Sequence, residues 1–211
     1  METLAKKMAQ SIGKSLGKTE EEIAVIAYGL IGILQFSTIF VLSSIIGLIF
    51  GFWLETAIVF LSVGFLRRLT GGAHSSGIYS CLVYSVFFVC GISAIAHYLL
   101  ATLAWQINLG LLAAVFLFGY VTVALKAPVT PPNKPCRTEQ KRKRLRRGSF
   151  IVLSLFLVAS LLCVMLGWKW CVRCYSVGLS LVLSTLWQIT MMTAVGKGFV
   201  EFIDGLFAPK S

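Results

Sequence analysis

Long apolar runs separated by short polar segments are the main pattern of this chain. The first run extends from Ile23 to Leu66, with Glu55 as its one charged residue. A membrane-spanning helix needs roughly 20 apolar residues, so this run suits two helices that turn around Gly47–Glu55, the second from about Phe52 to Leu66. Later runs predict further spans at about 78–103, 109–125, 150–168 and 177–195. The pattern therefore predicts about six transmembrane helices.

Both ends of the chain carry amphipathic patterns. Within residues 1–22, lysines alternate with apolar residues that are four positions apart, namely Leu4, Met8, Ile12 and Leu16. This pattern predicts a basic amphipathic N-terminal helix on the membrane surface; a frayed polar tail is the alternative. Thr19 and Glu22 are then expected to form a capping box that opens the first span. After residue 198, apolar residues mixed with acidic ones predict a short interfacial helix.

The composition supports a membrane protein. Hydrophobic residues make up 57% of the 211 residues and charged residues 13%, which is outside the usual range of soluble domains. Because six spans leave no room for a separate soluble domain, the whole chain, 1–211, is expected to be a single transmembrane domain. The predicted fold class is all-α: a polytopic membrane protein.

The net charge of +11 is concentrated in short segments between the apolar runs, as the positive-inside rule describes. Residues 126–149 hold the largest of these segments and are predicted to be a basic cytoplasmic loop. With six spans, this loop, Arg67, Arg68 and both termini lie on one side of the membrane, which is then the cytoplasmic side. Topology explains the charge, so nucleic acid is not an expected partner.

A glycine-rich segment between the second and third spans contains the best candidates for chemistry. Gly71, Gly72 and Gly77 interrupt helical backbone there, with His74 between them and Cys81 seven residues after it. In a continuous helix those two side chains would be about 10.5 Å apart along the axis. The break would let the imidazole fold back over the helix start and reach the thiol.

This arrangement predicts a cysteine nucleophile. A thiol near a helix N-terminus and beside an imidazole is favoured as the thiolate, with Cys81 as nucleophile and His74 as base. Backbone groups of the turn at Gly71, Gly72 and Ser75 are the expected oxyanion stabilisers. On spacing alone, a single histidine and a single cysteine in a membrane protein are more often packing residues than a catalytic pair. No metal or cofactor is predicted, because the metalloprotease H-E-x-x-H pattern is absent from the sequence.

The run from Arg67 to His74, followed after six intervening residues by Cys81, resembles the signature of the accessory gene regulator B family. The similarity extends to Lys126–Val129, the basic segment after it, and the overall length. The resemblance implies a bacterial cell-membrane cysteine endopeptidase that processes the precursor of a quorum-sensing autoinducing peptide. It assigns the catalytic pair to His74 and Cys81. It also implies a peptide substrate with an amphipathic N-terminal part and an acidic C-terminal tail.

Two interpretations stay open for the basic residues near this segment. They could bind the acidic tail of a peptide substrate or anionic lipid headgroups. The residues concerned are Arg67, Arg68, Lys141, Arg142, Lys143, Arg144, Arg146 and Arg147. Gly29 and Gly32, within the first span, are compatible with helix contacts in a homodimer.

The remaining cysteines and histidine point to other roles. We expect His97 to be a satisfied core histidine, Cys90 and Cys163 to be packing residues, and Cys136 to be an ordinary loop residue. Cys171 and Cys174 form a C-x-x-C pair on the outer face, where a disulfide could form. A membrane thiol-redox protein that uses this pair is therefore one alternative function, and a non-catalytic peptide exporter or scaffold is another.

Overall fold

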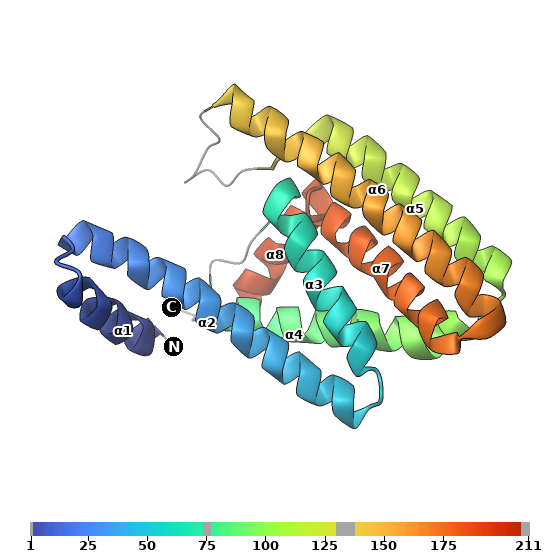
Figure 1. Ribbon diagram of the computed structural model, residues 1–211, viewed down its shortest axis with the longest axis horizontal. Coiled ribbons are helices and arrows are strands. Elements are labelled where there is room, and N and C mark those ends of the chain that lie inside the picture. The colour runs from blue at the N-terminus through green and yellow to red at the C-terminus, as the bar shows by residue number, and fades with distance from the viewer. Residues whose placement is uncertain (1, 74–76, 130–137, 208–211) are drawn as a thin grey trace.

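The computed structural model describes residues 2–73, 77–129 and 138–207, and these residues are almost entirely helical (Figure 1). The α-helices of the described residues are α1 (Glu2–Ser15), α2 (Glu20–Ile49), α3 (Trp53–Thr70), α4 (Ile78–Ala94), α5 (Trp105–Lys126), α6 (Glu139–Trp170), α7 (Val172–Thr190) and α8 (Ala194–Phe207). A π-helical turn, η1 (Ile95–Leu99), and a 3-10 turn, η2 (Leu100–Thr102), extend α4.

The prediction of an all-α polytopic membrane protein is confirmed. Four helical segments of the described chain are long and apolar enough to cross a membrane, namely α2, Tyr79–Thr102, α5 and Glu139–Gly167. The pair α7 and α8, bent by 83°, passes the same test as a fifth. The count is thus below the predicted six. The helix α3 falls outside this group because its 18 residues include Glu55, Arg67 and Arg68.

The basic segment at 126–149 is not a loop throughout, so this prediction was wrong in its second half. The helix α6 begins at Glu139 and continues without interruption through the Lys141–Arg147 run into the apolar stretch. Lysine, arginine and leucine all favour helix, whereas the prediction had taken charge as the mark of a loop. The basic side chains therefore project from a rigid helical extension.

Two polar residues near predicted ends of spans are buried. The helix α5 begins at Trp105, before the predicted start of the span at 109, and Asn108 is fully buried. The Asn108 amide donates to the Leu100 carbonyl (2.8 Å) and to the Tyr175 hydroxyl (2.6 Å). Glu55 is also buried. Partners on other helical segments bind the Asn108 amide N–H groups and the Glu55 carboxylate, which lowers the cost of removing these groups from water. Asn108 Oδ1 has no hydrogen-bond partner among the described residues.

The N-terminal helix α1 folds back along the first half of α2 (Figure 1). The predicted capping box is present: the Glu22 N–H donates to Thr19 Oγ1 (3.4 Å), and the Thr19 N–H donates to the Glu22 carboxylate (3.0 Å). The side of α1 that packs on α2 is made of small residues that the sequence reading had not singled out. These are Ala5, Ala9 and Gly13.

This packing leaves the predicted apolar stripe of α1 outside the protein. A side chain at Gly13 would collide with Ile23, since its Cβ would lie 2.3 Å from Ile23 Cγ1. The larger residues of the helix remain exposed, namely Leu4, Met8, Ile12 and Leu16. The amphipathic N-terminal helix is therefore confirmed, with its apolar stripe available to a membrane surface.

Two apolar cores hold the helices together. The larger one joins α3, α5, α6 and α7, and includes Leu66, Leu153, Leu179 and Ile189. Helices α5 and α6 lie side by side along it (Figure 1). The smaller core joins α2, α3 and α4 through Ile39, Val59, Phe60, Val89 and Ile92. The candidate nucleophile lies at the edge of this smaller core.

Candidate active site

Cys81 lies in the first turns of α4, as predicted. Gly77 precedes the helix in an extended conformation, and the Cys81 N–H donates to the Gly77 carbonyl (3.0 Å). The helix thus begins where the glycine-rich segment was expected to interrupt helicity. The Cys81 side chain is buried, with 6% of its surface exposed. It therefore lies near the positive end of the α4 dipole and away from bulk water.

Hydroxyl groups surround the Cys81 thiol. The thiol donates to the Tyr84 hydroxyl (Sγ–Oη 3.9 Å), and the Ser85 hydroxyl lies 4.0 Å from the same sulfur. Arg67 lines the same cavity as Tyr84 and Cys81. A fixed positive charge and two hydroxyl groups therefore lie in the surroundings of the sulfur.

Arg67 also holds the glycine-rich turn. Its Nη2 donates to the Ala73 carbonyl (2.6 Å), so this guanidinium links α3, the turn and the surroundings of the thiol. The next residue, Arg68, is exposed. The two arginines, which the sequence reading treated as equivalent, have different environments, and of the two only Arg67 faces Cys81.

The turn at Gly71 and Gly72 takes a backbone conformation that favours glycine. The φ angles are +70° at Gly71 and +134° at Gly72. A Cβ at Gly71 would lie 1.8 Å from the Val129 carbonyl oxygen. The Val129 N–H in turn donates to the Thr70 carbonyl (2.8 Å). Glycine is therefore required where the chain leaves α3 and passes the end of α5.

The bend between α7 and α8 anchors the other side of this turn. The Ala73 N–H donates to the Met191 carbonyl (2.9 Å). The buried Gln188 amide donates to the Gly71 carbonyl (2.8 Å) and to Thr70 Oγ1 (3.0 Å). These contacts join residues more than 110 positions apart in the sequence. Sequence reasoning missed Gln188 because it is one of several uncharged polar residues within an apolar run.

The predicted base and its neighbour lie outside the described residues. His74 and Ser75 fall between Ala73 and Gly77, both of which the structure places. Gly71 is described, and its N–H donates to the Arg67 carbonyl (2.9 Å). This bond closes the end of α3, so the Gly71 N–H is engaged within the protein.

Asp204 is a second residue that the sequence reading did not connect with the site. The Ser80 hydroxyl donates to Asp204 Oδ1 (3.2 Å), which brings a carboxylate of α8 next to the residue before Cys81. The sequence indicated only a short amphipathic tail helix here. The 83° bend after α7 turns this helix back toward the start of α4.

A cavity of about 220 Å³ opens beside the thiol. Helices α2, α3 and α4, together with Trp187 of α7, form its walls, and Cys81 and Arg67 are among its lining residues. The Trp187 ring stacks on Phe88 with ring centroids 3.9 Å apart, and Phe199 of α8 packs edge-on against both rings. The candidate nucleophile therefore faces a largely apolar space.

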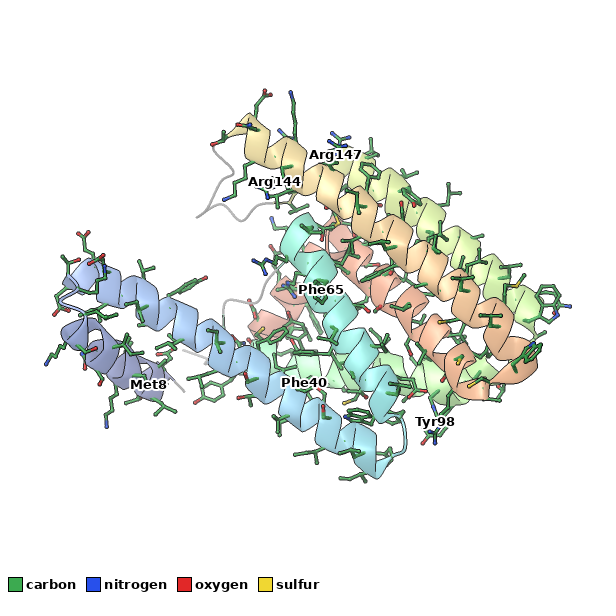
Figure 2. The ribbon with its side chains drawn as sticks, viewed as in Figure 1. Met8, Phe40, Phe65, Tyr98, Arg144 and Arg147 are labelled. Atoms are coloured by element: carbon green, nitrogen blue, oxygen red, sulfur yellow. The ribbon has the colours of Figure 1, made fainter. Side chains whose placement is uncertain are left out.

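The basic residues of α6 lie elsewhere. All of the charged side chains of the Lys141–Arg147 run are exposed, and none of them lines the cavity beside Cys81. Lys141, Arg144 and Arg147 instead border a separate surface groove with Leu69 of α3. Arg144 and Arg147 lie in the N-terminal part of α6 (Figure 2). The structure thus separates this basic face from the thiol.

The other candidates form separate groups. His97 is satisfied, as predicted: its Nδ1 lies 2.8 Å from Glu55 Oε1, which also accepts from the Ser176 hydroxyl. Cys171 and Cys174 are exposed free thiols at the start of α7. The Cys174 N–H donates to Cys171 Sγ (3.4 Å), and this hydrogen bond lowers the pKa of the Cys171 thiol. Cys136 lies outside the described residues.

Comparison with known proteins shows the family of the chain. The family model for accessory gene regulator B (AgrB) matches residues 5–192. The chain belongs to the AgrB family. It is 30% identical to an AgrB-like protein of Clostridium perfringens (strain SM101 / Type A), over 97% of this chain and 96% of the relative. The predicted resemblance is therefore confirmed.

Two further relatives span most of the chain. A second AgrB-like protein, from Clostridium perfringens (strain 13 / Type A), is 29% identical over 97% of this chain and 96% of its own length. One from Halalkalibacterium halodurans is 28% identical over 93% of this chain and 88% of the relative. No solved structure matches the chain. The AgrB family is involved in processing the agr quorum-sensing peptide, and the functional class follows from this membership.

Proposed function

We propose that this AgrB-family protein is a membrane-embedded cysteine endopeptidase that cleaves an autoinducing-peptide precursor on its C-terminal side. Cys81 is the nucleophile and His74 the general base. The observation that carries the proposal is the position of the Cys81 thiol, which is buried in the first turns of α4 and opens onto a cavity. A bacterial cell-membrane location, with both termini cytoplasmic, belongs to the same proposal.

The proposed cleavage begins with transfer of the thiol proton to His74. The Cys81 thiolate attacks the carbonyl carbon at the junction of the signal peptide and its C-terminal tail. The C–N bond then breaks, and the amine of the tail leaves with the proton from the imidazolium. A thioester between Cys81 and the signal peptide remains on the enzyme.

Ring closure follows as an exchange of acyl groups. A thiol within the bound peptide attacks the thioester carbonyl, the bond to Cys81 breaks, and a thiolactone is released; an internal hydroxyl would give a lactone. Thioester exchange conserves the activation of the acyl group, whereas hydrolysis loses it. A buried thiol favours exchange, because water is kept from the intermediate.

Two features support stabilisation of the oxyanion at this place. The first N–H groups of α4 lie at the positive end of the helix dipole, in the turns that carry Cys81. The Gly72 turn is fixed against the α7–α8 bend through the Ala73–Met191 hydrogen bond (2.9 Å). The Gly71 N–H is a poorer candidate, since its bond to the Arg67 carbonyl would have to break first.

The decisive experiment is reconstitution in liposomes with a synthetic precursor. We expect the purified protein to release the C-terminal tail without other proteins, and Cys81→Ala to abolish release while still inserting into the membrane. Cys90→Ala is the matched control, since Cys90 lies on the same helix and does not line the cavity. Mass spectrometry follows the tail and the acyl-enzyme.

Two results would contradict this assignment. Cleavage that persists in Cys81→Ala would exclude Cys81 as the nucleophile. A wild-type protein that inserts and binds the precursor without cleaving it would favour the exporter or scaffold alternative. Loss of activity in Cys171→Ser, with Cys81→Ala unaffected, would favour the thiol-redox alternative instead.

A further inference from the structure

The cavity beside Cys81 has a polar end and an apolar end. Its polar lining residues next to the sulfur are Tyr84 and Ser85, and Arg67 and Gln35 line it as well. Aromatic rings form much of the remaining wall. Phe36 and Phe60 meet with ring centroids 4.3 Å apart on one side, and Phe88 stacks on Trp187 on the other. The thiol therefore lies where a polar surface meets an aromatic one.

Glycine residues leave this cavity open. Gly32 of α2 is a lining residue, and a Cβ placed on it would have no heavy atom within 4 Å. Gly64 of α3 also lines the cavity, and a Cβ there would lie 3.4 Å from the Phe36 ring. Protein interiors are normally packed with few voids larger than a water molecule. An apolar space of this size beside a candidate nucleophile is thus a feature of a binding site.

We propose that this cavity binds the side chain of the substrate residue on the acyl side of the scissile bond, and that it selects a large apolar or aromatic side chain. The proposal rests on the proposed function, in which Cys81 attacks that residue's carbonyl carbon. A reactive complex brings the two atoms to about 3–3.5 Å. The side chain of the acyl residue is then only two bonds from the attacked carbon, within reach of the cavity that Cys81 lines.

The aromatic part of the lining disfavours the segment on the other side of the scissile bond. The proposed leaving segment is an acidic tail, and a carboxylate placed among the aromatic rings, away from Arg67 and Gln35, would lose its hydration without gaining enough partners. An apolar side chain has the opposite preference, because burial in this space removes it from water. Selection at the cavity would therefore place the cut after an apolar residue and before a charged segment.

Narrowing the cavity at Gly32 tests the proposal. Gly32→Leu places a side chain where the structure has open space, so the helix packing is not disturbed. Gly29→Leu is the matched control, since Gly29 is also on α2, also has open space around its Cβ position, and does not line the cavity. The substrates are two synthetic precursors that carry Phe or Ala on the acyl side of the scissile bond.

In the wild-type protein we expect kcat/KM for the Phe precursor to exceed that for the Ala precursor by about tenfold or more, the usual discrimination of an apolar pocket. Gly32→Leu should lower kcat/KM for the Phe precursor by about tenfold and leave the Ala precursor within about threefold. Gly29→Leu should change neither value. Phe36→Ala, which removes one wall, is a second variant and should improve cleavage of a precursor with Trp at this position.

The outcomes separate this inference from the proposed function. Cleavage could depend on Cys81 while the ratio of kcat/KM for the Phe and Ala precursors stays the same in both Gly32→Leu and Phe36→Ala. That result would overturn the proposed side-chain cavity and leave the proposed function intact. Equal losses for both precursors in Gly32→Leu, or the same losses in Gly29→Leu, would also overturn it and point to contacts of α2 with a second copy. Cleavage without Cys81 would instead remove the proposed function.

Discussion

At the scale of single residues, Gly71 combines a positive φ of 70° with direct backbone contact to Val129. An alanine there would have to adopt a left-handed conformation and displace the Val129 carbonyl as well. We expect Gly71→Ala to lower the free energy of unfolding by about 1–3 kcal/mol. It should also reduce Cys81-dependent cleavage, because the turn that leads to the active site would shift. Thermal unfolding in detergent and the liposome assay measure the two effects.

Gly91 of α4 provides the control for that substitution. A Cβ at Gly91 meets no heavy atom within 4 Å, so Gly91→Ala should leave cleavage unchanged and should not lower stability. If Gly71→Ala and Gly91→Ala had the same stability and the same rate of cleavage, the contact with Val129 would be shown to affect neither property.

At the scale of elements, the start of α7 changes the acidity of one thiol. The Cys174 N–H donates to Cys171 Sγ, and this lowers the pKa of Cys171. A lowered pKa means more thiolate at neutral pH, so alkylation of Cys171 should persist to lower pH than for an ordinary thiol, whose pKa is about 8.5. Iodoacetamide labelling against pH, with site-resolved mass spectrometry, measures this midpoint.

The labelling is best done in a Cys174→Ser background, which keeps the backbone donor and leaves one thiol of the pair. A midpoint at or above that of an ordinary thiol would show that the N–H of residue 174 does not stabilise the Cys171 thiolate. The buried Cys81 should label more slowly than Cys171 throughout the titration, because its sulfur is shielded from solvent.

The elements also show how far sequence reasoning reaches. Apolar runs predicted α2, α4 and α5 well, because lipid imposes a length of roughly 20 apolar residues on each span. The capping box at Thr19 and the helix start near Cys81 were also predictable, because both depend on contacts between residues close in sequence. The helical form of the Lys141–Arg147 run was missed because its charges were taken as a sign of a loop.

The site itself was predicted only in part. Cys81 and the special turn at Gly71 follow from local sequence, but the groups that hold them come from distant segments. Gln188 and Met191 fix the turn from the α7–α8 bend, and Asp204 reaches Ser80 from α8. Such contacts depend on how helices pack in three dimensions, and nothing in a single apolar run specifies its partner.

At the scale of the whole molecule, the basic face of α6 lies apart from the cavity beside Cys81. This separation suggests that the two regions bind different parts of the substrate. The cavity is apolar apart from its polar end, whereas Lys141, Arg144 and Arg147 surround a groove on the surface. An acidic tail that leaves Cys81 could extend toward this face while the apolar residue before the cut stays in the cavity. The two regions would then recognise opposite sides of one scissile bond.

Removing the positive charges that border this groove tests whether the groove binds the acidic tail. Replacing Lys141, Arg144 and Arg147 by Gln should raise KM for a precursor with an acidic tail by about tenfold, since each exposed pair contributes roughly 0.2–1 kcal/mol. The value of kcat should stay the same because Cys81 is untouched, and added salt should reduce the difference between variant and wild type. For a precursor with a neutral tail, KM should change neither in the triple variant nor with added salt.

The control for charge alone lies on α1. Replacing Lys6, Lys7 and Lys14 by Gln removes the same three charges from an exposed helix that does not border the groove. If both triple variants raised KM equally, the net charge of the protein would be the cause. If the α6 variant kept the wild-type KM and lost only binding to anionic vesicles, the basic face would be a lipid contact, and recognition of the precursor would depend on the cavity beside Cys81.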